Sequence, residues 1–201
     1  MAIRPDREGA DNRTIVWGDR RSYSSSSTDR RPGVRVPEIE RKFTVETVPQ
    51  QLLGPGSPIR QGYLTVEPVE VRIRARDGTH ELTAKSLGGL RRIEVNVPLT
   101  AGQFGELWSL VTASVEKTRH LVETGGVVVE VDVYAGKLEG LVVAEVEFPT
   151  EQEARDFDPP AWFGREVTED RRFRNAALAR ANTRPDSRSP PATVSRRSML
   201  C

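Results

Sequence analysis

The sequence predicts a mainly β protein, antiparallel and with a few short helices, on the strength of three observations. Polar and apolar residues alternate with a period of two in seven separate segments, which is the pattern of strands with one apolar face. An Asp77-Gly78 pair joins two of these segments, and this pair is a strong signal for a hairpin turn. Stretches with helical features are few and short, so helices are expected only at the periphery of the sheet.

The alternating segments place charged residues on one phase of each strand. They cover residues 38–43, 71–76, 81–85, 92–97, 117–120, 129–134 and 144–148. Acidic residues gather on the first segment and the last two, whereas Arg and Lys dominate the middle ones. Two interpretations are open: a sheet whose charged face lies in water, or a closed or nearly closed sheet whose charged faces turn inward. In the second, buried charges require counter-charges.

Three short helices are predicted from local signals. Thr100 with Gln103, and Thr150 with Glu153, fit the capping box that begins a helix. Asp170 precedes a third stretch with apolar residues at helical spacing. The predicted helices lie near residues 101–113, 150–157 and 170–180.

Composition divides the chain into a folded domain at 36–182 and two tails, 1–35 and 183–201, that we expect to be disordered. The tails are rich in Arg, Ser and Pro and poor in large apolar residues. Each tail has a net charge of +3 and the middle has −5, which disfavours a nucleic-acid partner. With one cysteine, no secretion signal and no long apolar run, the protein is expected to be cytoplasmic, without disulfides or a membrane partner.

The charged phases of the strands suggest a particular ligand. Carboxylates offer only oxygen atoms, which suit Mg²⁺ or Mn²⁺ better than Zn²⁺. Cations facing those carboxylates imply an anion, and a polyphosphate would satisfy both, because its oxygens bind Arg and Lys as well as a metal. Three of the four lysines, Lys42, Lys85 and Lys117, lie on these charged phases. We interpret both histidines, His80 and His120, as structural.

The first alternating segment, Glu38-Ile39-Glu40-Arg41-Lys42-Phe43, resembles the ExExK opening strand of the CYTH family, the triphosphate tunnel metalloenzymes. The resemblance extends in order over roughly residues 37–181 and is closest to the compact bacterial inorganic triphosphatases. Further matching blocks are Arg60–Leu64, Val71–Arg74, Leu82–Lys85, Lys117–Arg119, Glu130–Gly136, Ala144–Phe148 and Trp162–Asp170. It implies an eight-stranded antiparallel closed β-barrel, a tunnel with acidic and basic residues inside.

The resemblance also implies roles for individual residues. The metal ligands would be Glu38, Glu40, Glu145 and Glu147, with Asp132 and Glu130 as additional or water-mediated ligands. The phosphate clamp would be Arg72, Arg74, Lys85, Lys117 and Arg119, with Arg92 as an extra cation. Lys42 would neutralise the terminal phosphoryl group, and Lys42, Lys85 and Arg119 would be the catalytic residues. Glu94 would be a further tunnel acid, while Arg165 and Phe173 stand where the family often has lysine and tyrosine.

The expected function is the hydrolysis of inorganic triphosphate with two Mg²⁺ or Mn²⁺ ions, one bridging substrate and acids and one activating water. Alternatives on the same fold are a class IV adenylate cyclase and a thiamine or nucleoside triphosphatase. An alternative of another class is a non-catalytic module that binds polyphosphate or nucleotide. The partner would be a small triphosphate, and the protein would be a monomer or a homodimer.

Overall fold

The structure, a computed structural model, describes residues 39–86, 94–187 and 189. Glu38, Arg92, the segment 1–35 and most of the C-terminal stretch therefore lie outside the described residues. The strands are β1 (Ile39–Thr44), β2 (Gly56–Thr65), β3 (Val69–Arg76), β4 (Thr79–Ser86), β5 (Glu94–Pro98), β6 (Ala113–Thr124), β7 (Val127–Tyr134) and β8 (Val142–Phe148). The α-helices are α1 (Ala101–Trp108), α2 (Glu151–Asp156) and α3 (Asn175–Arg180), and the 3₁₀ helices are η1 (Gln50–Leu52), η2 (Gly136–Leu138) and η3 (Arg171–Phe173).

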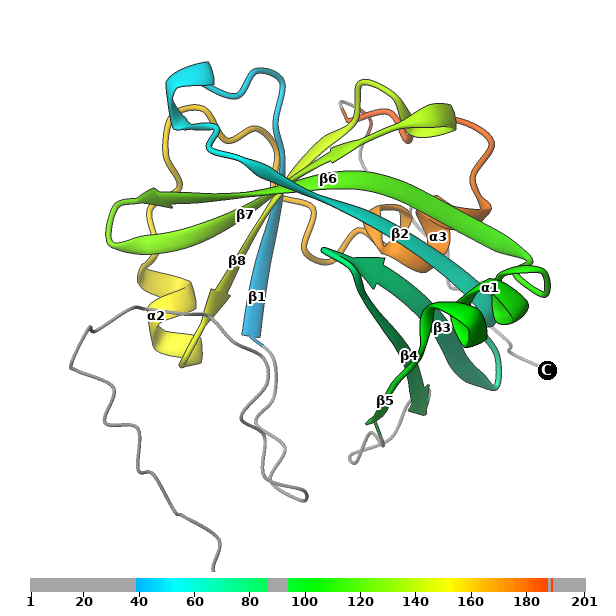
Figure 1. The fold of residues 1–201 in the computed structure, drawn as a ribbon. Helices are drawn as coiled ribbons and strands as arrows, with labels where there is room; N and C mark the ends of the chain where they lie inside the picture. Colours follow the sequence, from blue (N-terminus) through cyan, green and yellow to red (C-terminus); the bar gives the residue numbers. More distant parts are fainter. Residues whose placement is uncertain (1–38, 87–93, 188, 190–201) are drawn as a thin grey trace, which may run out of the picture. The chain divides into compact units, whose positions relative to one another are not determined.

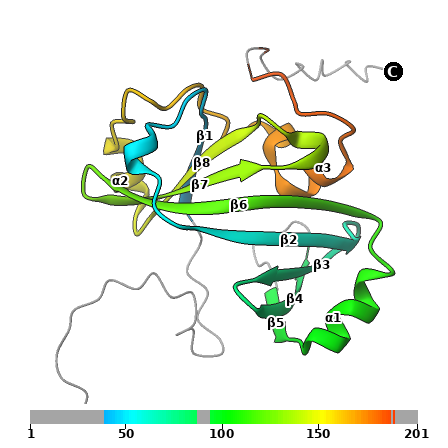
Figure 2. The same ribbon diagram turned by 45° about the horizontal axis from the view of Figure 1, so that its top comes forward.

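The strands form one eight-stranded antiparallel sheet in the order β1-β8-β7-β6-β2-β3-β4-β5. Figures 1 and 2 show β2 and β6 as the long central strands, with β1, β7 and β8 on one side and β3, β4 and β5 on the other. The prediction of an antiparallel, mainly β fold is confirmed. Among the described residues no ladder joins the edge strands β1 and β5, so closure into a barrel stays a prediction.

Two apolar clusters cover the two faces of this sheet. On one face, Val129 and Val131 of β7 and Val146 of β8 are fully buried. They pack in a cluster with Ala154 of α2, because α2 lies against β1 and β8. The residues on this face are the apolar ones that period-two alternation predicts to face a core.

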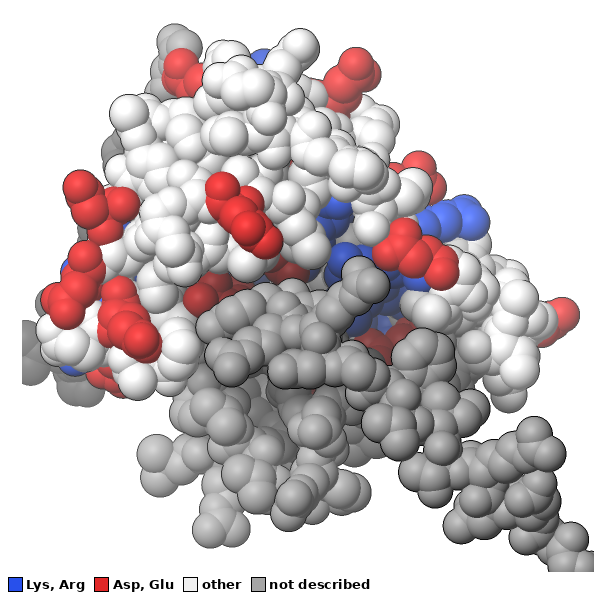
Figure 3. Space-filling view, turned by 60° about the vertical axis from the view of Figure 1, so that its left-hand side comes forward, with Lys and Arg blue, Asp and Glu red and all other residues white. Residues whose placement is uncertain are grey.

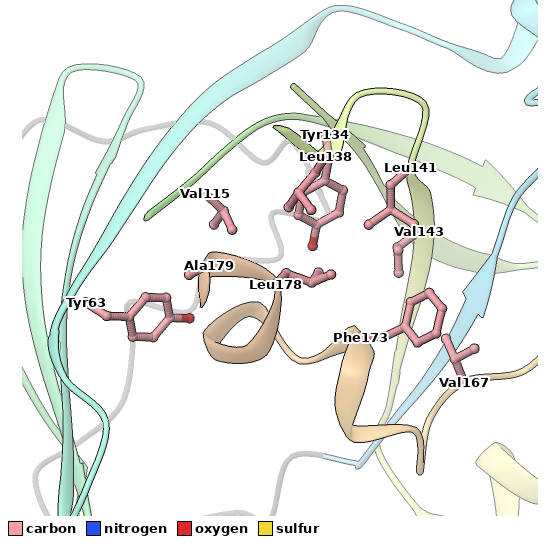
Figure 4. Close-up of a cluster of buried hydrophobic side chains, with 10 residues drawn as sticks. All are labelled: Tyr63, Val115, Tyr134, Leu138, Leu141, Val143, Val167, Phe173, Leu178 and Ala179. Atoms are coloured by element: carbon pink, nitrogen blue, oxygen red, sulfur yellow. The ribbon is translucent and has the colours of Figure 1, made fainter. Parts of the chain in front are cut away.

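The second cluster lies on the other face of the sheet and is built around α3. Leu178 and Ala179 of α3 are 0% and 1% exposed, and they pack with Tyr63 of β2 and Tyr134 of β7. Figure 4 shows α3 between Tyr63 on one side and Tyr134 on the other. The apolar residues at this end of the strands are therefore covered by α3 and are not exposed to solvent.

Among the strands of the described residues, β2 is the one that alternation does not predict, because Gly56, Pro58 and Gly62 interrupt its pattern. Gly62 is needed for packing: a Cβ at this position would lie 2.5 Å from Val111 and 3.0 Å from Trp108. The end of α1 and the turn after it thus rest directly on the backbone of β2. Close packing of this kind leaves no periodic signal in the sequence.

The three predicted helices are present, but they are shorter than expected. The capping box of α1 is formed, since Thr100 accepts a hydrogen bond from the Gln103 backbone and the Gln103 side chain accepts one from the Thr100 backbone. The third helix is divided, because Arg174 is extended and separates η3 from α3. Asp170 therefore caps η3, where its carboxylate accepts from the Arg172 backbone N–H. No helix among the described residues has the length and apolar character that a membrane crossing requires.

Replacing Leu178 by alanine tests how far the domain depends on the packing of α3. The side chain is fully buried, so Leu178→Ala should lower the free energy of unfolding by about 2–5 kcal/mol, measured by denaturant titration. Leu110, which is 64% exposed, is the matched control, and Leu110→Ala should change the same quantity by less than about 0.5 kcal/mol. Equal effects of the two substitutions would contradict the packing described here.

Candidate active site

The pairing register places opposite charges side by side on β1, β8, β7 and β6. Glu40 lies opposite Glu147, and Lys42 lies opposite Glu145. On the other side of β8, Glu145 lies opposite Glu130. Residues directly opposite in an antiparallel pair point to the same face. These side chains therefore share one face of the sheet, although they come from both ends of the folded domain.

The register continues this face across the rest of the sheet. Ile59 of β2 lies opposite Lys117 of β6 on one side and Arg76 of β3 on the other. On β4 and β5, Lys85 lies opposite Glu94. We call this surface the charged face; its charged residues include Glu40, Lys42, Arg72, Arg74, Glu81, Lys85, Glu94, Lys117, Arg119, Glu130, Asp132, Glu145 and Glu147. Figure 3 shows Lys and Arg side chains gathered in a recess with acidic side chains beside them.

Arg119 is the central cation of the charged face. Its Nε donates to Asp132 Oδ1 at 2.7 Å and its Nη2 to Asp132 Oδ2 at 2.6 Å. The same guanidinium donates to Glu145 at 3.2 Å and to Glu130. Burial alone would lower the pKa of Arg119, but Asp132 and the other acids raise it well above its usual value. One planar guanidinium group thus binds carboxylates of both β7 and β8.

Lys42 and Glu145 form a buried ion pair, with Nζ 2.9 Å from Oε1. Burial favours the neutral form of each side chain, but the opposite charge nearby has the larger total effect. The pKa of Lys42 is raised by Glu145 and Glu40 despite burial. Burial likewise opposes ionisation of Glu145, and Lys42, Lys117 and Arg119 nevertheless hold its pKa at about 2. Both groups are therefore charged at neutral pH.

Lys117 is the most deeply buried cation of the charged face, with a side chain that is 3% exposed. Its Nζ donates to Asp132 and, at 3.4 Å, to Asn175 Oδ1 at the start of α3. Burial lowers the pKa of Lys117, although Asp132 acts in the opposite direction. Sequence reasoning missed Asn175, since the long-range pairing that brings it to Lys117 has no local pattern.

The cations on β3 and β4 are more accessible. Lys85 Nζ lies 3.0 Å from Glu94, and Arg74 Nη2 lies 3.2 Å from Glu81, with both cation side chains about a third exposed, at 27% and 32%. The pKa of Arg74 is lowered by burial and by the positive charge of Arg72. Arg72 Nε is buried and has no hydrogen-bond partner among the described residues. Crowded cations with spare donors are suited to bind an anion.

The charged face can supply metal ligands in pairs. In the part of the chain that the structure describes, no three acidic, His or Cys side chains come together as a ready metal cage. The register instead sets Glu40 beside Glu147 and Glu130 beside Glu145. Mg²⁺ is commonly held by one or two carboxylates, with water and substrate phosphates completing its shell. The donor set therefore fits Mg²⁺ or Mn²⁺ bound together with a phosphate ligand.

Comparisons with known proteins identify a family and several relatives of this chain. The family model described as the CYTH domain matches residues 37–179. An inorganic triphosphatase of Nitrosomonas europaea is 46% identical over 146 residues, which are 71% of this chain and 96% of that protein. An inorganic triphosphatase of Acetivibrio thermocellus is 35% identical over 147 residues, covering 71% and 93%. The crystal structure of an inorganic triphosphatase superposes with a TM-score of 0.61 at 42% identity, covering 74% of this chain and 98% of that one.

The depressed pKa of Glu145 predicts acid-sensitive stability. A carboxyl whose pKa falls from 4.5 to about 2 on folding stabilises the protein above its unfolded pKa, and this contribution is lost as the pH falls through about 2. The advantage of the wild type over Glu145→Gln, up to about 3 kcal/mol, should therefore be largest above about pH 5 and shrink towards pH 2.

Denaturant titrations across this pH range provide the measurement. Glu151 is the matched control, because its side chain is 75% exposed and pairs with Arg155 on the surface of α2. The unfolding free energies of Glu151→Gln and the wild type should run parallel. If the unfolding free energy of Glu145→Gln also ran parallel to that of the wild type, the buried ion pair of Glu145 with Lys42 would be contradicted.

Proposed function

This chain belongs to the CYTH domain family, and from that premise we propose that it is a metal-dependent triphosphatase that hydrolyses inorganic triphosphate to diphosphate and phosphate. The observation that supports this most strongly is the pairing on the charged face. The carboxylates assigned to the metal are neighbours of the cations assigned to phosphate, as Arg119 with Asp132 and Lys42 with Glu145 illustrate. A ligand that contains both a divalent metal and a polyphosphate can satisfy both sets of charges.

We assign binding of the phosphate oxygens to Arg72, Arg74, Lys85, Lys117 and Arg119, with Arg92 as an additional cation. Arg72 and Arg74 have the guanidinium forks that match phosphate oxygens, and Lys85 is partly accessible on β4. These side chains would align the phosphate chain and stabilise the charge that develops on the transferred group. In this assignment Lys42, Lys85 and Arg119 are the catalytic residues.

We assign the metal to the carboxylates Glu38, Glu40, Glu145 and Glu147, with Glu130 and Asp132 as additional ligands and Glu94 as a further acid. When bound, two Mg²⁺ or Mn²⁺ ions would neutralise phosphate oxygens and activate the attacking water. Glu145 is ionised at neutral pH because Lys42 and Arg119 keep its pKa low, so its oxygens are available as ligands without loss of a proton.

Substrate binding then becomes an exchange of partners. Before binding, Arg119 is held by carboxylates of β7 and β8. When those oxygens turn to a metal and the guanidinium turns to a phosphate, no buried charge loses its counter-charge. We further propose that the two edges of the sheet approach each other around this ligand, which would complete the tunnel.

The direct test is phosphate release from triphosphate, ATP and thiamine triphosphate, each with Mg²⁺, Mn²⁺ or a chelator. We expect metal-dependent release, fastest from inorganic triphosphate. Glu147→Gln and Lys85→Ala should each lower turnover by about 10²- to 10³-fold, since each removes one charged contact to metal or phosphate. Glu151→Gln, on the surface of α2, should leave turnover unchanged.

The same assay separates the competing functions. Cyclic AMP and diphosphate formed from ATP would identify a cyclase. Phosphate release that is faster from thiamine triphosphate than from inorganic triphosphate would identify a thiamine triphosphatase. Tight binding of triphosphate without turnover would identify a non-catalytic module. Wild-type turnover by both Glu147→Gln and Lys85→Ala would contradict the assigned roles.

The exchange of partners predicts an effect of Arg119 on metal binding in the absence of substrate. Arg119→Gln leaves Glu130 and Glu145 without this counter-charge, so Mn²⁺ affinity without triphosphate should rise by about tenfold, measured by calorimetry. Triphosphate affinity should fall in the same variant. Arg155→Gln, which removes a surface cation, should change neither. An Mn²⁺ affinity that falls in Arg119→Gln would show that Arg119 does not compete with the metal.

A further inference from the structure

The N-terminal end of α3 reaches the charged face through the side chain of Asn175. Its Oδ1 accepts a hydrogen bond from the Tyr134 hydroxyl at 2.7 Å and one from Lys117 Nζ at 3.4 Å. Both donors come from the sheet, Tyr134 from β7 and Lys117 from β6, and the register sets them directly opposite each other. One amide oxygen therefore connects the helix to two adjacent strands.

From Lys117 the contacts continue to the centre of the site. Lys117 Nζ donates to Asp132, and the same carboxylate accepts two hydrogen bonds from the Arg119 guanidinium, at 2.7 and 2.6 Å. Asp132 is 0% exposed, so its carboxylate depends on these two cations as counter-charges. Lys117 and Arg119 therefore share the Asp132 carboxylate as a common acceptor.

The helix that provides Asn175 is fixed at its other end as well. Leu178 and Ala179 are buried in the cluster around α3, and Lys137 Nζ donates to the carbonyl of Ala179. A cation at this end also complements the helix dipole. Because packing and hydrogen bonds hold α3 in place, its first residue presents Oδ1 to Lys117 at a defined point.

We propose that Asn175 is a positioning residue: it holds Lys117 Nζ in the geometry that receives the phosphate chain. This inference rests on the proposed triphosphatase function and adds a residue outside the strands to it. An ammonium group has three donors on a flexible stem, so without the acceptor on α3 Lys117 is restrained chiefly by Asp132. Tyr134 would at the same time lose the acceptor of its buried hydroxyl.

A double-mutant cycle tests this role. Asn175→Leu removes the acceptor at similar volume, and Lys117→Met removes the ammonium at similar length. We expect Asn175→Leu to weaken the binding of inorganic triphosphate, measured by calorimetry without metal, and to lower kcat/KM, each by about tenfold or more. In the Lys117→Met background the same substitution should change both quantities by less than about twofold, because the ammonium group through which Asn175 acts is gone, whereas independent residues would again lose about tenfold.

Controls separate positioning from folding and from the proposed function. Arg174→Gln changes an exposed side chain at the same end of α3 and should leave binding unchanged. Melting temperatures show whether each variant is folded, and if Asn175→Leu is not, Tyr134→Phe replaces it in the same cycle with the same expectation. Wild-type protein that binds triphosphate without hydrolysing it would reject the triphosphatase, while the binding cycle still tests Asn175. Equal losses in the wild-type and Lys117→Met backgrounds, or no loss in either, would overturn the positioning role.

Discussion

The interaction on which the rest of this structure depends is the pairing of buried opposite charges on one face of the sheet. Asp132 and Lys117 are almost completely removed from water, and neither could be buried in its charged form alone. Arg119 joins this pair to Glu145, whose second partner is Lys42. Because every one of these charges depends on a neighbour from another strand, the register of β1, β8, β7 and β6 is fixed by electrostatics as well as by packing.

The antiparallel sheet is what makes such a face available. Alternation gives each strand one phase for the core and one for the charges, so the apolar cluster with Val131 and Val146 lies on one side and the ion pairs lie on the other. At one end of the strands, the side of the sheet that carries the charges also has apolar residues, and Leu178 of α3 packs against them. The face therefore has a packed, apolar end next to Lys117 and a more accessible basic region on β3 and β4.

Much of this could be predicted from the sequence, because period-two alternation is a local signal. Seven of the eight strands, the capping box at Thr100 and the segregation of acids from cations all follow from short patterns. The rest depends on distant contacts. Alternation does not predict β2, because Gly62 interrupts the pattern and is required there by the close approach of Val111. Asn175 comes into contact with Lys117 only when the chain folds. The break at Arg174 also follows from tertiary packing, which outweighs helical spacing.

Under the proposed function, the two sets of charges serve one composite ligand, a divalent metal with a polyphosphate. A crystal structure of the protein grown with Mn²⁺ and triphosphate, with the metal located by its anomalous scattering, tests this most directly. We expect metal at the carboxylates of β1 and β8 and phosphate oxygens at the Arg and Lys side chains of β3, β4 and β6. Metal and phosphate bound away from the charged face, with Arg119 still held by Asp132, Glu130 and Glu145, would contradict it.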